Sequence, residues 1–338
     1  MNFKKNLAPP EVVCLGEALL DRLGPIGGAP SQSKDVVDCL GGAPANVACG
    51  LARLDVNVAF VGRFGQDLVA RKFLDLMSQR NINLNAVQID EIRPTRIVLV
   101  SRDLNGERSF NGFSGDLGKG FSDQALSIVE LKNKFQDLFS HSKYLLIGTI
   151  PLASKYSSES ILWSIDESLR NNVDIAIDIN WRSKFWNIKR DSDSGPDASD
   201  LKIISPVLQK ASLIKVSKEE AIWFFNSYSP KFISKSLPQN PDVVVTNGSR
   251  KIEWFLKGFE GNTIPIKGGN IIDTTGAGDA FMAGLLYGLI HNSSSYSNDI
   301  VKHIVEFAAA CGAIVCEKSG AIDPQPNVLD VQRFLLKK

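Results

Sequence analysis

The stretch that decides the fold is residues 273–286, DTTGAGDAFMAGLL. Apolar Ile271 and Ile272 lead into a Gly-rich turn, and a run with helical character follows. A Gly-rich turn that feeds a helix N-terminus directs several backbone N–H groups at one point, and the helix dipole adds partial positive charge there. The segment therefore predicts a pocket for phosphate, or for the negative charge on a phosphoryl group in transfer.

Asp279 is the unusual residue of this segment, because a carboxylate in an anion pocket repels a bound phosphate. One interpretation is a first-turn or N-cap role that stabilises the helix by about 0.5–2 kcal/mol. The other is a general base that removes the proton of a substrate hydroxyl beside the pocket. The spacing alone leaves both open. Two other phosphate-binding motifs are excluded. The segment is not a dinucleotide fingerprint, because Phe281 stands where the third Gly is needed. Lys119 does not belong to a Walker A loop, because Gly120 follows it in place of Ser or Thr.

Outward from this segment, short apolar runs alternate with helical stretches. The runs lie at 12–15, 58–61, 144–147, 175–177, 213–216 and 243–245, and helical spacing occurs at 45–54, 157–170 and 218–225. This alternation is typical of βαβ units, so we expect an α/β fold with a parallel sheet covered on both faces. Two β-rich stretches, about 18–40 and 95–115, break the alternation and, with the hairpin signal Asn105-Gly106, predict a small accessory sheet used as a lid. The polar run 191–200, DSDSGPDASD, predicts a surface loop.

Composition and charge are those of an ordinary globular protein. Of 338 residues, 43% are hydrophobic and 22% charged, which excludes a disordered or collagen-like chain. Lys plus Arg number 38 against 37 for Asp plus Glu, so the net charge of +1 predicts neither a nucleic-acid nor a membrane partner. The five cysteines form no CxxC pair, which argues against a zinc site or a disulfide framework. The N-terminus lacks the apolar stretch of a signal peptide and no apolar run is long enough to span a bilayer, so we expect a cytoplasmic protein.

Several motifs together resemble one known family. DTTGAGDAFMAGLL resembles the second signature of the PfkB (ribokinase-like) carbohydrate kinases, and GGAPANVA at 41–48, with Gly65 downstream, resembles the first. DINWRSKFW at 178–186 and GEALLD at 16–21 are similar to segments of the fructokinase and 2-keto-3-deoxygluconate kinase branch. The resemblance covers about 11–335. It implies one ribokinase-like kinase domain, a three-layer α/β/α sandwich with a mostly parallel central sheet and a small β-sheet lid.

The resemblance assigns the catalytic residues to the Gly-rich turn. It implies that Asp279 is the base that deprotonates a primary hydroxyl of the sugar. It also implies that the backbone amides of Gly276, Ala277 and Gly278 form the anion hole for the γ-phosphoryl group. These roles agree with the pocket predicted above and favour the base over the cap.

For the sugar, the matching hydroxyl-binding positions are Asp21, Gly41, Gly42 and Asn46. A carboxylate accepts paired hydroxyl hydrogen bonds, an Asn side chain both donates and accepts, and Gly lets the backbone approach the ring. Two arginines extend this set. Arg96 lies on the lid strand, and Arg182 lies in the segment at 178–186. Either could contact a sugar oxygen or a phosphate, and for each an ion-paired or solvated role is equally open.

For the nucleotide, KVSKEE at 215–220 stands where the family has N-x-x-E, with Ser217 in place of the usual Asn. Glu220 then matches the acidic residue that organises Mg²⁺ through its waters, and Asp178 and Asn180 are candidates for the same region. Thr246 and Gly248 match the T-x-G turn beside the phosphates and adenine. The implied cofactors are ATP and Mg²⁺.

The family also places a monovalent cation, such as K⁺, beside the anion hole. The matching positions are Asp273, Thr275, Val315, Lys318 and Gly320. Pro324 falls where a hydroxyl ligand often lies, which counts against the site.

The leading functional hypothesis is an ATP-dependent sugar kinase that converts fructose to fructose 6-phosphate. A kinase for 2-keto-3-deoxygluconate or another ketose is the alternative, because Arg96 or Arg182 could pair with a substrate carboxylate, and because 115–120 replaces a sugar-contacting stretch of many fructokinases. A catalytically silent regulatory protein of the same family is a third hypothesis, but the intact Asp279 and Gly-rich turn argue against it. The exposed edges of an accessory sheet favour a homodimer formed through the lid.

Overall fold

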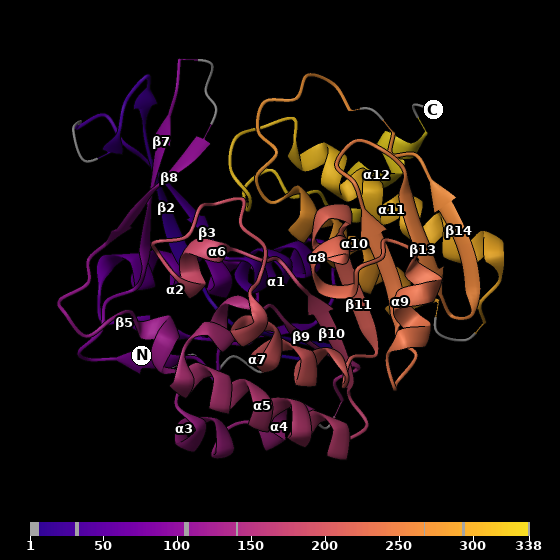
Figure 1. Ribbon diagram of the computed structural model, residues 1–338, viewed down its shortest axis with the longest axis horizontal. Helices are drawn as coiled ribbons and strands as arrows, with labels where there is room; N and C mark the ends of the chain where they lie inside the picture. The colour runs from indigo at the N-terminus through magenta and orange to yellow at the C-terminus, as the bar shows by residue number, and fades with distance from the viewer. Residues whose placement is uncertain are drawn as a thin grey trace.

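A central sheet with helices on both faces forms the body of the protein (Figure 1). The computed structural model describes residues 7–30, 34–104, 108–139, 141–266, 268–292 and 295–336. The strands of this sheet are β1 Val12–Leu15, β4 Val58–Val61, β9 Tyr144–Ile147, β10 Asp174–Asp178, β11 Leu213–Ser217, β12 Asp242–Thr246, β13 Ile252–Leu256 and β14 Phe259–Thr263. Their order is β14-β13-β12-β11-β10-β9-β1-β4, and all neighbours from β4 to β12 are parallel. The predicted α/β class with a mostly parallel sheet is confirmed.

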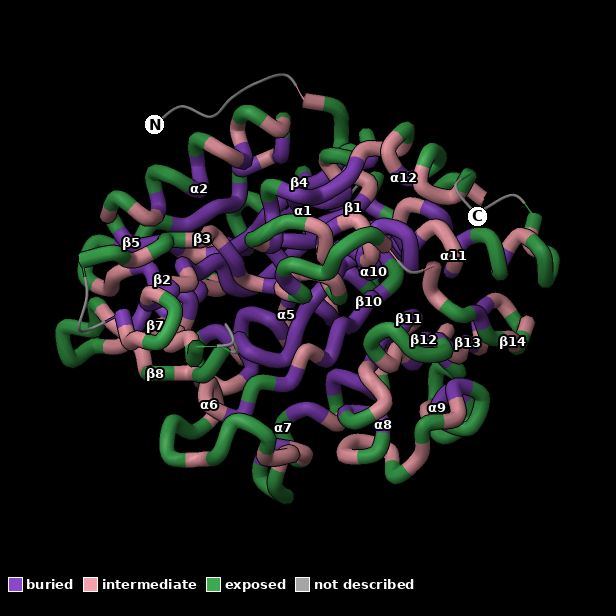
Figure 2. Tube along the Cα trace, turned by 90° about the horizontal axis from the view of Figure 1, so that it is seen from above, coloured by how far each residue is buried: buried purple, intermediate pink, exposed green. Residues whose placement is uncertain are grey.

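Side chains of each parallel strand alternate between two hydrophobic cores. In β1, Val12 and Cys14 belong to one core, whereas Val13 and Leu15 belong to the other. A strand covered on both faces reads as a continuous apolar run, which is why the sequence pattern located β1. Figure 2 shows the buried residues concentrated in the sheet and in the helices directly against it.

The helices divide between the two faces. One core includes α1 Ala43–Arg53, α2 Leu68–Gln79, α10 Ala277–His291, α11 Asn298–Val315 and α12 Val328–Leu335. The other includes α3 Ile128–Lys132, α4 Gln136–Phe139, α5 Lys155–Arg170, α6 Ser183–Trp186, α7 Ala198–Leu208, α8 Lys218–Phe225 and α9 Pro230–Ser236. Helices, sheet and helices therefore form the three layers expected from the sequence.

The antiparallel edge of the sheet was not predicted. Strands β13 and β14 form a hairpin beside β12, closed at Lys257 and Gly258, which both have positive φ. The Lys-Gly pair between two alternating runs is a turn signal that could have located it. The hairpin lies at the far end of the sheet from β4 (Figure 1).

A separate four-stranded sheet stands beside this body. It consists of β2 Leu19–Ile26, β3 Val37–Gly41, β7 Ile97–Arg102 and β8 Arg108–Ser114, in the order β3-β2-β7-β8. We call it the lid sheet. Figure 1 shows it projecting from the end of the molecule opposite β14. The predicted turn at Asn105-Gly106 lies outside the described residues.

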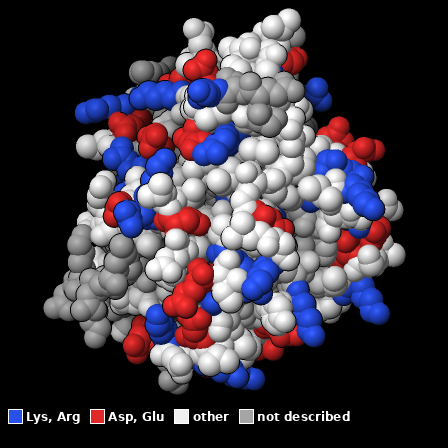
Figure 3. Space-filling model, turned by 90° about the vertical axis from the view of Figure 1, so that its left-hand side faces the viewer, with Lys and Arg blue, Asp and Glu red and all other residues white. Residues whose placement is uncertain are grey.

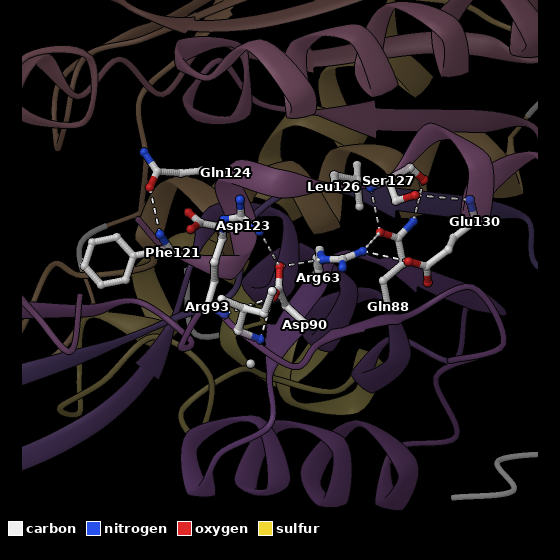
Figure 4. Close-up of polar contacts among 12 residues, drawn as sticks. Arg63, Gln88, Asp90, Arg93, Phe121, Asp123, Gln124, Leu126, Ser127 and Glu130 are labelled. Carbon is white, nitrogen blue, oxygen red and sulfur yellow. Dashed lines mark hydrogen bonds and ion pairs between the residues drawn. The ribbon is translucent and has the colours of Figure 1, made fainter. Parts of the chain in front are cut away.

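The root of the lid sheet is held by a network of polar contacts (Figure 4). The short parallel strands β5 Arg63–Gly65 and β6 Gln88–Asp90 meet here. Arg63 donates to Asp90 at 3.0 Å and to Glu130 at 2.7 Å. Asp90 also accepts the backbone N–H of Arg93, just before the lid strand β7. Chain segments that enter and leave the lid sheet are thereby joined to each other.

The polar run 191–200 is more ordered than the predicted surface loop, and that prediction was wrong for its last residues. Helix α7 begins at Ala198 with Asp197 as its N-cap and Asp200 completing a capping box. Arg190 forms ion pairs with both carboxylates. The Ser194 carbonyl accepts the indole N–H of Trp181 at 2.8 Å. The acidic side chains that suggested a solvated loop are here helix-capping and ion-pairing groups.

The face that carries the lid sheet shows acidic and basic side chains intermixed (Figure 3). This agrees with the balance of 38 basic and 37 acidic residues. Among the described helices, none combines the length and apolar character needed to cross a membrane.

Candidate active site

The Gly-rich turn is the N-terminus of α10. Gly276 is the N-cap and has φ of 78°, a left-handed conformation that favours Gly. A Cβ at this position would lie 2.5 Å from the Cβ of Ala321, so the turn has no room for a side chain. The first N–H groups of a helix have no partner within it, and here they follow Gly276 in the chain. The Ala277 N–H makes a long hydrogen bond of 3.3 Å to the Thr274 carbonyl.

Asp279 lies in the first turn of α10 but does not cap it. The cap residue is Gly276, which provides no side-chain bond, and the Asp279 carboxylate instead accepts the Asn46 amide at 2.7 Å. Burial raises the pKa of Asp279, while Lys215, the Asn46 hydrogen bond and Arg182 oppose that rise. A half-buried carboxylate with an elevated pKa at an amide-lined turn is suited to accept a proton.

Lys215 is a site residue that the sequence analysis quoted without a role. It projects from β11, and its Nζ lies 2.9 and 3.1 Å from the two carboxylate oxygens of Asp178. A Cβ at Gly278 would lie 2.9 Å from the same nitrogen, so the ammonium group lies directly against the turn. Burial disfavours its charge, but Asp178 and Asp279 outweigh burial and raise the pKa of Lys215. A lysine on the apolar face of a predicted strand carries no sequence signal beyond its charge.

The sugar-side positions gather on the other side of Asp279. Asn46 comes from α1 and is buried, and its Oδ1 has no hydrogen-bond partner among the described residues. Asp21 comes from β2, and a Cβ at Gly41 would lie 3.0 Å from its Oδ2. Gly42 has φ of 100°, and a Cβ there would lie 2.7 Å from the Glu17 carbonyl oxygen. Both glycines therefore allow the backbone to pass close to carboxylate and carbonyl oxygens.

The carboxyl groups near this position are desolvated. Burial raises the pKa of Asp21 to about 6, against the opposing charges of Arg108 and Arg182. Burial raises the pKa of Glu17 to about 8, and Glu17 Oε2 has no hydrogen-bond partner among the described residues. Burial raises the pKa of Asp178 to about 6 although Lys215 opposes it. At Asp21 and Asp178, the nearby positive side chains do not offset the effect of burial on the pKa.

Arg96, one of the predicted sugar-binding candidates, makes its contacts within the protein. It is buried and forms a bidentate ion pair with Asp123, at 3.0 and 3.1 Å. Its guanidinium carbon also lies within 5.0 Å of the ring centroids of Phe113, Phe121 and Phe185. The structure therefore gives Arg96 the ion-paired role, because its charge is neutralised by Asp123 and its planar group is enclosed by aromatic rings.

Arg182 is the arginine that remains available. Its side chain is exposed and donates to the adjacent Trp181 carbonyl at 2.9 Å. It is close enough to Asp21 and Asp279 to lower the pKa of both.

A cavity of about 560 Å³ lies beside the turn and is lined by two of the four nucleotide-side candidates. Thr246 and Gly248 line it at the end of β12, and Ala277 and Gly278 line its other end. Its walls are otherwise largely apolar, from Ile252, Ile266, Phe281, Ala309 and Ala313. A flat apolar ring could lie between these walls with its phosphates at the helix N-terminus.

Ser217 and Glu220 form a capping box at the start of α8. Glu220 Oε2 accepts the Ser217 N–H at 2.8 Å, and the Ser217 hydroxyl accepts the Glu220 N–H at 3.2 Å. Glu220 Oε1 accepts the Trp181 N–H at 2.7 Å. Each carboxylate oxygen keeps a second lone pair, so the arrangement still fits a metal-bound water. Of the described residues, no group of three His, Cys, Asp or Glu side chains could hold a metal by itself.

Asp273, one of the positions predicted to hold a monovalent cation, is engaged by several N–H donors. Asp273 Oδ1 accepts the Thr275 N–H at 3.0 Å, and Oδ2 accepts the Gly320 N–H at 2.9 Å. Oδ2 also accepts Arg108 from the lid sheet, at 2.6 Å. The Val315 carbonyl accepts the Lys318 N–H at 3.3 Å. Asp273 is thus committed to N–H donors, and one of them already carries a positive charge.

The site combines a proton acceptor, an amide-lined helix terminus and an adjacent apolar cavity. On an α/β scaffold, this combination is typical of a phosphotransferase. The pfkB family carbohydrate kinase model matches residues 9–328, and the chain belongs to this family. It is therefore a sugar phosphotransferase.

Individual relatives agree over nearly the whole chain. Fructokinase-2 of Oryza sativa subsp. japonica is 30% identical over 334 residues, which is 97% of this chain and 95% of the relative. A crystal structure of fructokinase from Vibrio cholerae O395 in fructose-, ADP- and calcium-bound form is 27% identical, with a TM-score of 0.77. The match covers 96% of this chain and 99% of the fructokinase chain. A double mutant of that enzyme in fructose-, ADP- and potassium-bound form has a TM-score of 0.76 and 27% identity. The match covers 98% of this chain and 100% of the mutant chain.

Proposed function

We propose that this kinase transfers the γ-phosphate of ATP to a primary hydroxyl of fructose and releases fructose 6-phosphate and ADP. The observation that carries the proposal is the position of Asp279, half-buried at the amide-lined turn and hydrogen-bonded to Asn46 of the sugar side. The fructokinase relatives, which match the chain over nearly its full length, supply the choice of sugar.

In the proposed reaction, Asp279 takes the proton of the acceptor hydroxyl as the new O–P bond forms. The bond between the γ-phosphorus and the β,γ-bridging oxygen breaks, and ADP leaves with that electron pair. The backbone amides at Gly276–Gly278 offset the negative charge on the transferring group. Asn46 holds the Asp279 carboxylate in place, and its Oδ1, which has no hydrogen-bond partner among the described residues, is proposed to accept a sugar hydroxyl.

Lys215 extends this proposal to the phosphoryl group. Its Nζ lies against Gly278 and is held by Asp178, so a phosphoryl oxygen at the turn would meet a charged donor. A charge-assisted hydrogen bond of this kind is stronger than one from an amide. We therefore propose Lys215 as a contact of the γ-phosphoryl group.

Mg²⁺ is proposed as the companion of ATP, and it supplies neutralisation of phosphate charge when bound. Glu220 and Asp178 are the carboxylates proposed to hold its waters, because both act on Lys215, which lies against Gly278 of the turn. The adenine is proposed to lie between the apolar walls of the 560 Å³ cavity, beyond Thr246 and Gly248.

A keto-acid sugar such as 2-keto-3-deoxygluconate is the second candidate, and Arg182 is the observation that favours it. This side chain is exposed and lies near Asp21 and Asp279, where a substrate carboxylate would need a cation. Arg96 no longer supports this candidate, because Asp123 neutralises it.

We also propose a homodimer formed through the lid sheet, in the cytoplasm. Exposed Ile26 and Val37 on β2 and β3, with Leu104 after β7, support an apolar lid-to-lid contact. The five unpaired cysteines suit a reducing compartment. Light scattering on the full chain tests the dimer, because Ile26→Lys should yield a monomer, and an unchanged mass for this variant would contradict the lid interface.

The function is tested by measuring ADP release with ATP, Mg²⁺ and one sugar at a time. The panel contains fructose, 2-keto-3-deoxygluconate, ribose, tagatose and adenosine. We expect the highest kcat/KM with fructose and a 6-phosphate product by phosphorus NMR. A clear preference for the keto acid, lost in Arg182→Gln, would support the second candidate instead. No ADP release with any of them would contradict both.

A further inference from the structure

Arg108 is the residue through which the lid sheet contacts the loop before the anion hole. Its Nη2 donates to Asp273 Oδ2 and its Nη1 donates to Thr275 Oγ1, each at 2.6 Å. Arg108 begins strand β8, whereas Asp273 and Thr275 lead directly into the turn at Gly276. The two partners are 165 and 167 residues away in the sequence.

The same carboxylate joins a third part of the chain. Asp273 Oδ2 accepts both Arg108 and the Gly320 N–H, and Oδ1 accepts the Thr275 N–H. The Asp273 side chain is 6% exposed and the Arg108 side chain 29% exposed, so the carboxylate is shielded from water while the guanidinium group stays partly open to it. A guanidinium group placed here balances the carboxylate charge and fixes the loop that shapes the anion hole.

We infer that Arg108 supplies from the lid sheet the positive charge that a bound monovalent cation would otherwise supply at Asp273, beside the anion hole. The role is one of positioning, because Arg108 acts on the turn at Gly276 through Asp273 and Thr275. The observation that carries it is that Asp273 already accepts a charged donor, the guanidinium group of Arg108. Contact of the lid sheet with this loop and ordering of the anion hole then occur together, because both depend on the Arg108 hydrogen bonds.

The test compares the wild type with Arg108→Gln and Arg108→Lys in potassium, sodium or tetramethylammonium chloride at equal ionic strength. One readout is the thermal midpoint of the free protein, which requires no turnover. The other is kcat and KM for fructose, and only this arm rests on the proposed function. We expect the wild type to be indifferent to the cation. Arg108→Gln should lose about tenfold in kcat/KM in tetramethylammonium, regain part of it in potassium, and show a higher midpoint in potassium.

Matched variants separate charge from simple damage to the lid. Arg22 also donates two hydrogen bonds, both to the Asp38 carboxylate, but wholly within the lid sheet, so Arg22→Gln should behave as the wild type. Arg108→Lys retains a charge and should remain indifferent to potassium. A saturable rise of the wild-type midpoint or kcat with potassium would overturn the inference, as would an Arg108→Gln protein that shows no potassium effect. If fructose is not phosphorylated at all, the thermal midpoints still decide the matter.

Discussion

Asp279 shows how its surroundings change the meaning of one residue. In sequence it is an acidic residue in the first turn of a helix, a position where carboxylates commonly stabilise the helix. In the structure its bond goes to Asn46 on another helix, and burial raises its pKa. The same carboxylate is thereby removed from capping and placed where a hydroxyl proton must go.

The first prediction at this scale is that Asp279→Asn lowers kcat by about 10²–10⁴-fold, because the amide cannot accept the proton. Nucleotide and sugar affinities should change little. Steady-state kinetics with isothermal titration of both ligands checks this. Asp299→Asn is the control, since Asp299 is an exposed first-turn acid on α11. Near-normal turnover by Asp279→Asn would remove the proposed base.

The second concerns Lys215. Lys215→Met should lower kcat by about 10²–10³-fold, because a charged donor beside the phosphoryl position is lost. It should also move the acidic limb of the kcat/KM profile to higher pH, since Lys215 opposes the raised pKa of Asp279. Lys257→Met is the control, because Lys257 pairs with Asp242 at the first residue of β12 and, among the residues that the structure describes, has no contact with Asp178 or the turn at Gly276. A profile that keeps its position would argue against coupling of Lys215 to the base.

At the scale of elements, the site depends on how helix and strand termini meet. The N-terminus of α8 is tied to the loop after β10 by one carboxylate, because Glu220 accepts N–H groups from both Ser217 and Trp181. This joins the nucleotide side to the segment that carries Arg182. The lid sheet is similarly joined at its root by Asp90 and at its tip by Arg108.

The capping box gives a prediction that separates two roles of Glu220. Ser217→Ala should cost about 1 kcal/mol of unfolding free energy and leave the Mg²⁺ titration unchanged, because only the cap is lost. Glu220→Gln should in addition raise the Mg²⁺ concentration required for half-maximal rate. Chemical denaturation and Mg²⁺ titrations at saturating substrates measure the two effects. Identical Mg²⁺ titrations for both variants would limit Glu220 to capping.

At the scale of the whole molecule, burial of carboxyl groups around the site costs stability as the pH rises. The pKa of Glu17 is raised from 4.5 to about 8, chiefly by burial. The folded protein therefore holds a proton that the unfolded chain releases, and the free energy of unfolding falls between pH 4.5 and about pH 8. The lost free energy of unfolding is the cost of keeping the Glu17 carboxyl group out of water.

Glu17→Gln is expected to flatten that dependence, because the amide does not titrate. Near pH 8 the variant should be more stable than the wild type, by an amount on the order of a few kcal/mol. Denaturant unfolding across this pH range measures it. Glu159→Gln, on an exposed position of α5, should keep the wild-type slope. A variant with the wild-type slope would show that Glu17 is not the group responsible.

Much of the fold was determined by the sequence itself. Buried parallel strands are continuous apolar runs, so β1, β4 and β9 were located to the residue. The Gly-rich turn could also be predicted from the sequence, because a left-handed Gly276 and a following helix are local properties of the chain. The hairpin β13–β14 and the capped start of α7 were missed, since their signals are short or resemble those of a loop.

Only the tertiary structure decided which charges meet. Arg96 pairs with Asp123, Arg108 with Asp273, and Lys215 with Asp178, and each pair is separated by 27 or more residues. Local periodicity records which face of an element is apolar, but it carries no information about which distant ion will lie opposite a given side chain. That choice is made when elements pack and water is excluded, because a buried charge must then find whatever partner the fold brings within reach.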